Sequence, residues 1–273
     1  MQLQLVPASR GFAWMQQGIR TFGKRPVALL GLFMIFLLAM SILAMIPWIG
    51  LVLALALLPA VTLGFMSATR TVAHGDFPMP TVLLTAFRAG KEQLHGMLLL
   101  GGIYAMLFGA SMALTQLIDG GQFIKLYLLG VSTSPEEIRQ IAGDGSFQLA
   151  TLVAAVSNVL IAMLFWHASA LLHWHQVPAI KAMFFSLVAC IRNFPAYVLF
   201  LLGWVGVAVA VIFGASLLLA TLFGSMVAAV VMQFLMIIVT CMFFASQYFS
   251  YVDCFVEATA LDHQARQQTP PAF

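Results

Sequence analysis

The stretch "HQVPAIKAMFFSLVACIRNFP", residues 175–195, decides how the fold is interpreted. It lies between two long apolar runs and carries only two charges, Lys181 and Arg192. These cations are eleven residues apart, so an α-helix places them on one face, opposite an apolar face. Such a helix lies in the membrane interface, with its cations at the headgroups. We expect Pro178 to begin this helix and Pro195 to turn the chain into the next span, because proline suits a first helical turn and disfavours helix in the residue before it.

The composition is that of a polytopic membrane protein. Of 273 residues, 62% are hydrophobic and 8% are charged, and the mean hydropathy is +1.02. A soluble domain averages about 45–50% apolar and about 25% charged residues. Three cysteines, Cys190, Cys241 and Cys254, have no metal-binding spacing and do not indicate a disulfide framework. The basic N-terminal stretch precedes an apolar run of about 20 residues, so we expect a first membrane span rather than a cleaved signal.

Six apolar runs are long enough to cross a bilayer, which takes roughly 20 residues. They are residues 27–46, 49–69, 95–118, 148–172, 196–221 and 225–250. Tight turns join the first pair and the last pair, whereas a polar connection, 119–147, joins the middle pair. Within it, Ser134-Pro135-Glu136-Glu137 is a capping box, which predicts a short helix that stops at Gly143. We predict one membrane domain over residues 1–260 and a disordered cytoplasmic tail over 261–273.

The distribution of lysine and arginine predicts the orientation. Ten of the twelve fall before the first span, after an even-numbered span, or in the tail, whereas only Lys125 and Arg139 fall on the other side. Positively charged connections stay in the cytoplasm. We therefore expect both termini in the cytoplasm of a bacterium, with the chain in its inner membrane.

Three segments, each beginning at a proline, precede the three pairs of spans. The prolines are Pro7, Pro80 and Pro178, separated by 73 and 98 residues, and the longer middle connection accounts for the 25-residue difference. We predict an all-α fold of three parallel repeats, each an interfacial amphipathic helix followed by a transmembrane hairpin. The repeats would cover residues 7–70, 80–172 and 178–251. The alternative is that these segments are ordinary loops or the ends of tilted spans.

The interfacial helices supply the first set of candidate functional residues. We expect their cations, and one tryptophan, at the lipid headgroups. These residues are Arg10, Trp14, Arg20, Lys24, Arg25, Arg88, Lys91, Lys181 and Arg192.

Pro59, Asn158 and Gln233 form a second candidate set, a possible intramembrane polar cluster. The repeat spacing places them at similar depths in the three even-numbered spans. Intramembrane polar groups are often functional, but hydrogen bonding between helices explains them too. The spans carry no Asp, Glu, Lys or Arg at mid-depth, which argues against a proton relay or an ion pump.

Histidines and small residues offer further patterns. His167, His173 and His175 lack the i, i+4 spacing of a helical metal site, so we predict no metal and no other cofactor. Small residues at helical spacing predict close approach of neighbouring helices. They are Gly206, Ala210 and Gly214 in the fifth span, and Gly102 and Gly109 in the third.

The N-terminal 100 residues resemble an uncharacterised family of proteobacterial inner-membrane proteins. The resemblance rests on Pro-Ala-x-x-Gly-x-x-Trp (residues 7–14), the Lys24-Arg25-Pro26 junction and the Ile-Pro-x-x-Gly turn (residues 46–50). It implies an inner-membrane location and no particular activity. The hairpin plan is also similar to the membrane domains of some bacterial glycerophosphodiesterases, although we expect no such enzyme domain in this chain.

The leading functional hypothesis is a non-enzymatic scaffold, assembly partner or lipid-organising module. The alternative is a transporter or channel for a small or apolar solute, with a cavity between the repeats. We expect the lipid bilayer as a partner, another membrane protein as a further candidate partner, and no nucleic acid.

Overall fold

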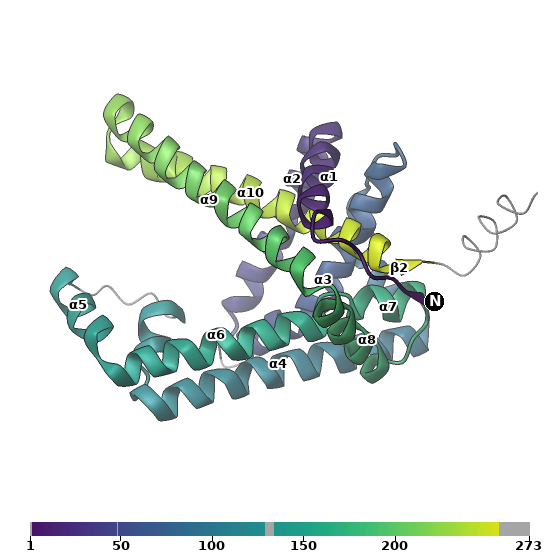
Figure 1. Ribbon diagram of the computed structural model, residues 1–273, viewed down its shortest axis with the longest axis horizontal. Coiled ribbons are helices and arrows are strands. Elements are labelled where there is room, and N and C mark those ends of the chain that lie inside the picture. Colours follow the sequence, from purple (N-terminus) through teal and green to yellow (C-terminus); the bar gives the residue numbers. More distant parts are fainter. Residues whose placement is uncertain (1, 48, 129–133, 257–273) are drawn as a thin grey trace, which may run out of the picture.

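The computed structural model describes residues 2–47, 49–128 and 134–256. Six helices in this part of the chain are long and apolar enough to cross a membrane, which confirms an all-α membrane protein. They form three hairpins (Figure 1). The hairpins are α2 (Pro26–Ala44) with α3 (Gly50–Ala73), α4 (Lys91–Asp119) with α6 (Gly145–Phe165), and α9 (Phe194–Phe223) with α10 (Ser225–Cys254). The predicted tail, with Arg266, and Trp48 lie outside the described residues.

Shorter elements precede the first hairpin, lie within or between the hairpins, or follow the last one. They are β1 (Gln2–Leu3), α1 (Arg10–Lys24), η1 (Pro80–Phe87), η2 (Ile124–Leu128), α5 (Pro135–Gly143), α7 (Ala168–Trp174), α8 (Ala179–Arg192) and β2 (Phe255–Val256). β1 and β2 pair in antiparallel register, Gln2 with Val256 and Leu3 with Phe255. The sequence did not predict this pairing, which holds both ends of the described chain at one side of the molecule.

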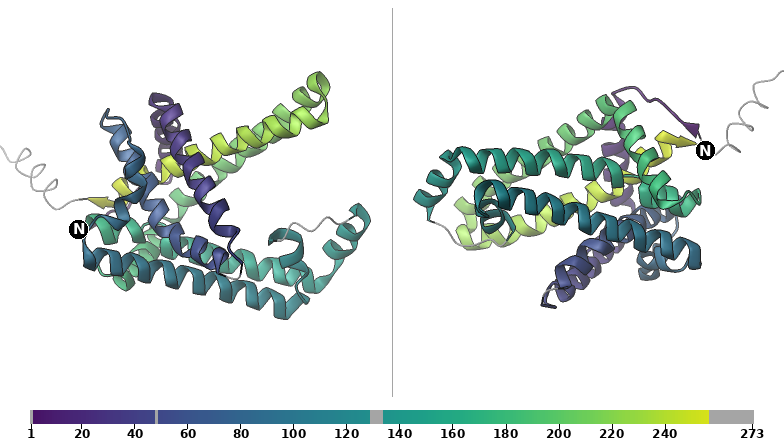
Figure 2. Two further views of the ribbon diagram at one scale, coloured as in Figure 1. Left: turned by 180° about the vertical axis from the view of Figure 1, so that it is seen from behind. Right: turned by 90° about the horizontal axis from the view of Figure 1, so that it is seen from below.

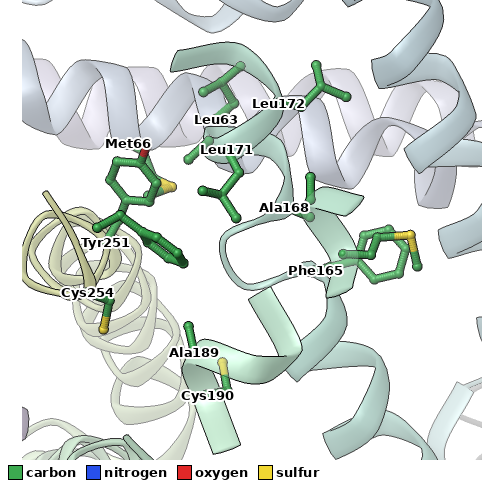
Figure 3. Close-up of a cluster of buried hydrophobic side chains, with 14 of the residues drawn as sticks. Leu63, Met66, Phe165, Ala168, Leu171, Leu172, Ala189, Cys190, Tyr251 and Cys254 are labelled. Carbon is green, nitrogen blue, oxygen red and sulfur yellow. The ribbon is translucent and has the colours of Figure 1, made fainter. Parts of the chain in front are cut away.

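The three hairpins spread away from a common base. In Figure 1, α9–α10 and α4–α6 extend to the left and diverge, and in the right-hand view of Figure 2 the α2–α3 hairpin points downward, away from both. The base contains α1, α7, α8 and the β1–β2 pair. Its core includes Leu63 of α3, Leu171 of α7, Ala189 of α8 and Tyr251 of α10 (Figure 3). The hairpins are therefore joined at their base.

Local signals in the sequence predicted several helix boundaries correctly. α2 begins at Pro26 directly after α1, and the chain bends at Arg25, whose φ is −143°. Pro178 is the N-cap of α8, so the helix in residues 175–195 begins where we expected. α5 has both halves of the predicted capping box, between Ser134 and Glu137, and ends at Gly143.

The second proline-led segment differs from the prediction. Instead of one amphipathic α-helix, it forms the 3₁₀ helix η1, which ends at Phe87. Gly90 then adopts a φ of +98°, a conformation that suits glycine and breaks the helix. Lys91 consequently begins membrane helix α4 and does not belong to an interfacial helix.

The fourth predicted span is also interrupted. α6 ends at Phe165, and α7 begins at Ala168. The backbone N–H of His167 donates to the hydroxyl of Ser186 in α8, at 2.9 Å, rather than to a carbonyl of its own helix. The backbone N–H that the break leaves unpaired within its helix is therefore satisfied by a side chain of α8.

Glycine does permit close helix contacts, but at other positions than predicted. Gly101 of α4 lies against α3, where an added methyl group would be 2.1 Å from the Ala56 carbonyl oxygen. The predicted positions have no neighbouring atom within 4 Å of such a methyl group: Gly102, Gly109, Gly206 and Gly214. Because the hairpins diverge, no helix in the described part of the chain packs against these four glycines.

Candidate functional site at the base of the hairpins

Helix α1 packs into the angle between α9 and α10. Gly11 and Gly18, seven residues apart, lie on the packed face. A methyl group on Gly11 would be 2.1 Å from the Ala196 carbonyl oxygen of α9, and one on Gly18 would be 2.5 Å from Cβ of Ser246 in α10. α1 thus contacts the third hairpin through its backbone.

Trp14 lies on the same face of α1 and is completely buried. Its ring centroid is 5.2 Å from that of Tyr197 and 6.1 Å from that of Phe200, both in α9. The predicted position of this tryptophan at the headgroups therefore differs from the structure. The glycines on either side bring α1 so close to α9 and α10 that its tryptophan enters the base.

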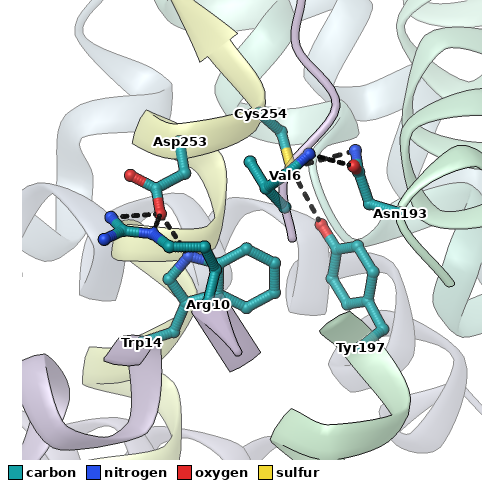
Figure 4. A network of polar contacts seen from close by, with 7 residues as sticks. All are labelled: Val6, Arg10, Trp14, Asn193, Tyr197, Asp253 and Cys254. Atoms are coloured by element: carbon teal, nitrogen blue, oxygen red, sulfur yellow. Dashed lines mark hydrogen bonds and ion pairs between the residues drawn. The ribbon is translucent and has the colours of Figure 1, made fainter. Parts of the chain in front are cut away.

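Asp253, near the end of α10, binds two side chains of α1 (Figure 4). Its Oδ2 accepts hydrogen bonds from Nε1 of Trp14 at 2.6 Å and from Nε of Arg10 at 2.7 Å. A guanidinium nitrogen of Arg10 completes the ion pair at 2.6 Å. Arg10, a predicted headgroup cation, is thus neutralised within the protein.

Asn193, between α8 and α9, holds the N-terminal segment. Its Oδ1 accepts from the Val6 N–H at 2.8 Å (Figure 4). Its Nδ2 donates to the Gln4 carbonyl oxygen at 3.1 Å. The residue is 1% exposed. Its amide therefore pairs backbone groups of a partly exposed extended segment that no neighbouring strand pairs at these positions. Sequence reasoning missed Asn193 and Asp253, although an acid that ends an apolar span on the cation-rich side was a usable signal.

His167, between α6 and α7, contacts both α8 and α9. It is 0% exposed, and its Nε2 forms a hydrogen bond with the hydroxyl of Tyr197. Ser186, which accepts from the His167 backbone, donates to the Met163 carbonyl oxygen at 2.8 Å. Burial in the same region raises the pKa of the Cys190 thiol to about 12. These contacts connect α6 and α7 to α8 and α9.

The other predicted headgroup cations lie on the surface. All are exposed, and within the described residues none forms an ion pair with a carboxylate. They are Arg20, Lys24, Arg25, Arg88, Lys91, Lys181 and Arg192. Arg70, at the end of α3, is also exposed and lies over the Trp174 ring, 5.5 Å from its centroid. This end of the molecule therefore carries an excess of uncompensated positive charge.

Pro59, Asn158 and Gln233 are not brought together. Asn158 donates to the Ala154 carbonyl oxygen of its own helix at 2.8 Å. Gln233 lines a groove of about 460 Å³ between α2 and α10. Pro59 lines a separate cavity of about 180 Å³. Divergence of the hairpins explains the separation, because positions at equal depth move apart as the spans leave the base.

The cavity at Pro59 is contacted by all three hairpins. Its lining is mainly apolar, with several aromatic side chains, and includes Phe36, Tyr104, Trp166 and Gln247. Gln247 is 7% exposed, and its Oε1 has no hydrogen-bond partner in the described structure. Gln247, rather than Gln233, is therefore the amide that accompanies Pro59.

The geometry defines a multi-pass α-helical membrane protein with a polar, tightly packed base. In the described residues, no three His, Cys, Asp or Glu side chains gather in an arrangement that could hold a metal ion. A probable inner membrane protein of Burkholderia thailandensis is 38% identical to this chain over 257 residues, 93% of this chain and 94% of the relative. The chain belongs to the family of that bacterial inner-membrane protein. No family model and no solved structure matches it.

Proposed function

We propose that this protein is a non-enzymatic scaffold that organises lipids and other membrane proteins in the bacterial inner membrane. One observation carries the proposal: the base is closed by specific contacts, while the membrane helices leave their apolar surface uncovered. Only 11% of the residues in the apolar stretches of α9 and of α10, and 17% in α2, are buried within the chain. Such surfaces are satisfied by acyl chains or by helices of a partner.

The arrangement of the base supports three parallel repeats. η1 packs against α3 of the preceding hairpin, and α8 packs against α6 of its preceding hairpin. α1, the first proline-led helix, packs against α9 and α10 of the third hairpin. Each proline-led element thus contacts the hairpin before it in a closed cycle, the relation expected for units around an axis along the membrane normal.

The exposed cations support a cytoplasmic position for the base and for both termini. Eight exposed cations at this end have no carboxylate partner in the described residues, namely the seven predicted ones and Arg70. Anionic lipids of the cytoplasmic leaflet attract such residues, each by about 1 kcal/mol. The likeness to the membrane domains of glycerophosphodiesterases remains a prediction.

The cavity at Pro59 favours a second candidate, transport of an apolar solute. It lies where the three hairpins diverge, and the amide of Gln247 would orient a ligand within its aromatic walls. Its volume of about 180 Å³ is below the range of about 300–1,000 Å³ typical of small-molecule sites. We therefore rank transport second.

Purification in a mild detergent, followed by reconstitution, tests the scaffold proposal. We expect the protein to retain several phospholipids per chain and to remain associated with a defined membrane partner after crosslinking in the native membrane. Labels at Leu38, Leu160 and Val205, exposed positions in three different hairpins, should all contact brominated lipid in vesicles or be protected by that partner. A lipid-free, partnerless protein that moves a solute across liposomes would contradict the proposal and favour transport.

A further inference from the structure

A pocket of about 440 Å³ lies at the base, where α3 ends beside η1 and α7. Its polar lining comes from three elements and includes Thr71 of α3, Thr81 and Thr85 of η1, Arg88 and His173 of α7. The pocket is separate from the Asp253 clamp, the contacts of Asp253 with Arg10 and Trp14, and from the cavity at Pro59. Because it joins the end of one membrane span to the connection before the next, we expect it at the level of the lipid headgroups.

The free groups of this pocket are hydrogen-bond donors. Arg88 is exposed and has no carboxylate partner in the described structure. The hydroxyls of Thr71 and Thr85 are engaged by backbone carbonyls, which leaves that of Thr81 available. The His173 ring lines the pocket, and its buried Nδ1 has no hydrogen-bond partner among the described residues. A guanidinium, a hydroxyl and an imidazole together suit a phosphate group, which offers several acceptor oxygens.

Two neighbouring features distinguish a lipid phosphate from a free one. Phe77 and Met79, which also line the pocket, are 57% and 62% exposed, and they provide apolar contact for acyl chains beside the donors. The exposed carboxylate of Asp76, next to Phe77, repels a dianion more strongly than the single charge of a phosphodiester. Both features favour a ligand with one negative charge and an apolar body.

We propose that this pocket binds the phosphodiester of an anionic phospholipid, with Arg88 as the charged ligand and Thr81 and His173 as hydrogen-bond partners. The proposal rests on the proposed function, since a lipid-organising scaffold needs lipids held at defined places. Arg88 thereby differs from the other surface cations, which attract the anionic leaflet only as a diffuse charge.

The test is a titration of the full-length, detergent-purified protein with phosphatidylglycerol, followed by native mass spectrometry. We expect Arg88→Gln to weaken the first binding step about ten-fold, the usual effect of losing one charge-assisted hydrogen bond. Lys181→Gln is the matched control, because it removes one exposed, unpaired cation from the same end of the molecule and should leave that step unchanged. Phosphatidylcholine should bind more weakly than phosphatidylglycerol to the unsubstituted protein.

Three results would overturn the proposal. Equal losses in Arg88→Gln and Lys181→Gln would reduce the effect to diffuse charge, and no loss in Arg88→Gln would remove its role. Displacement of phosphatidylglycerol by millimolar inorganic phosphate would make the site one for the free anion. If Arg88→Gln does not fold, as judged by its melting curve, Thr81→Val makes the same test. Co-purification and transport measurements judge the scaffold itself, so the lipid site can fail while the scaffold stands.

Discussion

The carboxylate of Asp253 binds the guanidinium of Arg10 at 2.6 Å, across 243 residues of sequence. The same oxygen accepts the indole N–H of Trp14, so one carboxylate fixes helix α1 against the end of α10. The Arg10 side chain is 38% exposed and that of Asp253 is 19% exposed, so solvent screens the ion pair. The buried indole, which has no access to water, makes the hydrogen bond to Trp14 the larger contribution.

The loss of stability on replacing Asp253 should therefore depend on whether the new side chain still accepts a hydrogen bond from the Trp14 indole. Asp253→Ala leaves the indole N–H unpaired and should cost about 2 kcal/mol, whereas Asp253→Asn keeps an acceptor and should cost about 1 kcal/mol or less. Unfolding of the detergent-solubilised protein by added SDS measures both. Arg20→Ala is the control, since Arg20 is an exposed cation of the same helix without a carboxylate partner in the described residues. Equal stability of Asp253→Ala and the parent would show that the clamp does not hold α1.

Local signals carried most of what could be predicted from the sequence. Six apolar runs, the bend at Lys24-Arg25-Pro26, the start at Pro178 and the capping box at Ser134 depend on residues a few positions apart. The contacts that build the base instead join residues that are far apart in the sequence. Arg10 with Asp253, and Val6 with Asn193, are separated by more than 180 residues, and a single sequence contains no signal that pairs them.

Position along a helix was also insufficient to predict packing. Gly206 and Gly214 have the spacing of a close helix contact, yet none of the described helices lies against them. Pro59 and Gln233 were candidates for one polar cluster because of their matching depth, but the spread of the hairpins puts them in separate hollows. Packing at the base sets the angle between the hairpins. The spacing of residues within one span gives no information about this packing.

Gly18 tests whether α1 packs on α10 or lies free on the membrane surface. Gly18→Ala places a methyl group 2.5 Å from Cβ of Ser246 and should destabilise the protein by about 1–3 kcal/mol, because two backbones must separate. Gly23→Ala, in the same helix with no atom within 4 Å, should be neutral or stabilising by up to about 1 kcal/mol. Melting temperatures of the two variants in one detergent compare them. A surface-bound α1 would tolerate both substitutions equally.

Gly101 and Gly102 offer a matched pair inside the membrane. A methyl group on Gly101 would lie 2.1 Å from the carbonyl oxygen of Ala56, so Gly101→Ala should force α3 and α4 apart and lower stability by about 1–3 kcal/mol. The neighbouring Gly102→Ala meets no atom within 4 Å and should change stability little. SDS-driven unfolding of both variants measures the difference. Similar effects of the two substitutions would place the α3–α4 contact elsewhere.

The three cysteines should resist modification in the folded protein. All are buried, and the raised pKa of Cys190 leaves about one thiol in ten thousand as thiolate at pH 8, the form that reacts with a maleimide. We expect negligible labelling of Cys190, Cys241 and Cys254 within an hour at pH 7.5, and complete labelling after unfolding in SDS. A cysteine introduced at exposed Gly23 should react within minutes and serves as the control. Because the pKa of Cys190 is raised, each unit of pH above 7.5 should increase its thiolate fraction ten-fold. Labelling should nevertheless stay slow as long as α8 stays packed and Cys190 stays buried. Fast labelling of Cys190 in the native protein would mean that α8 separates from the base.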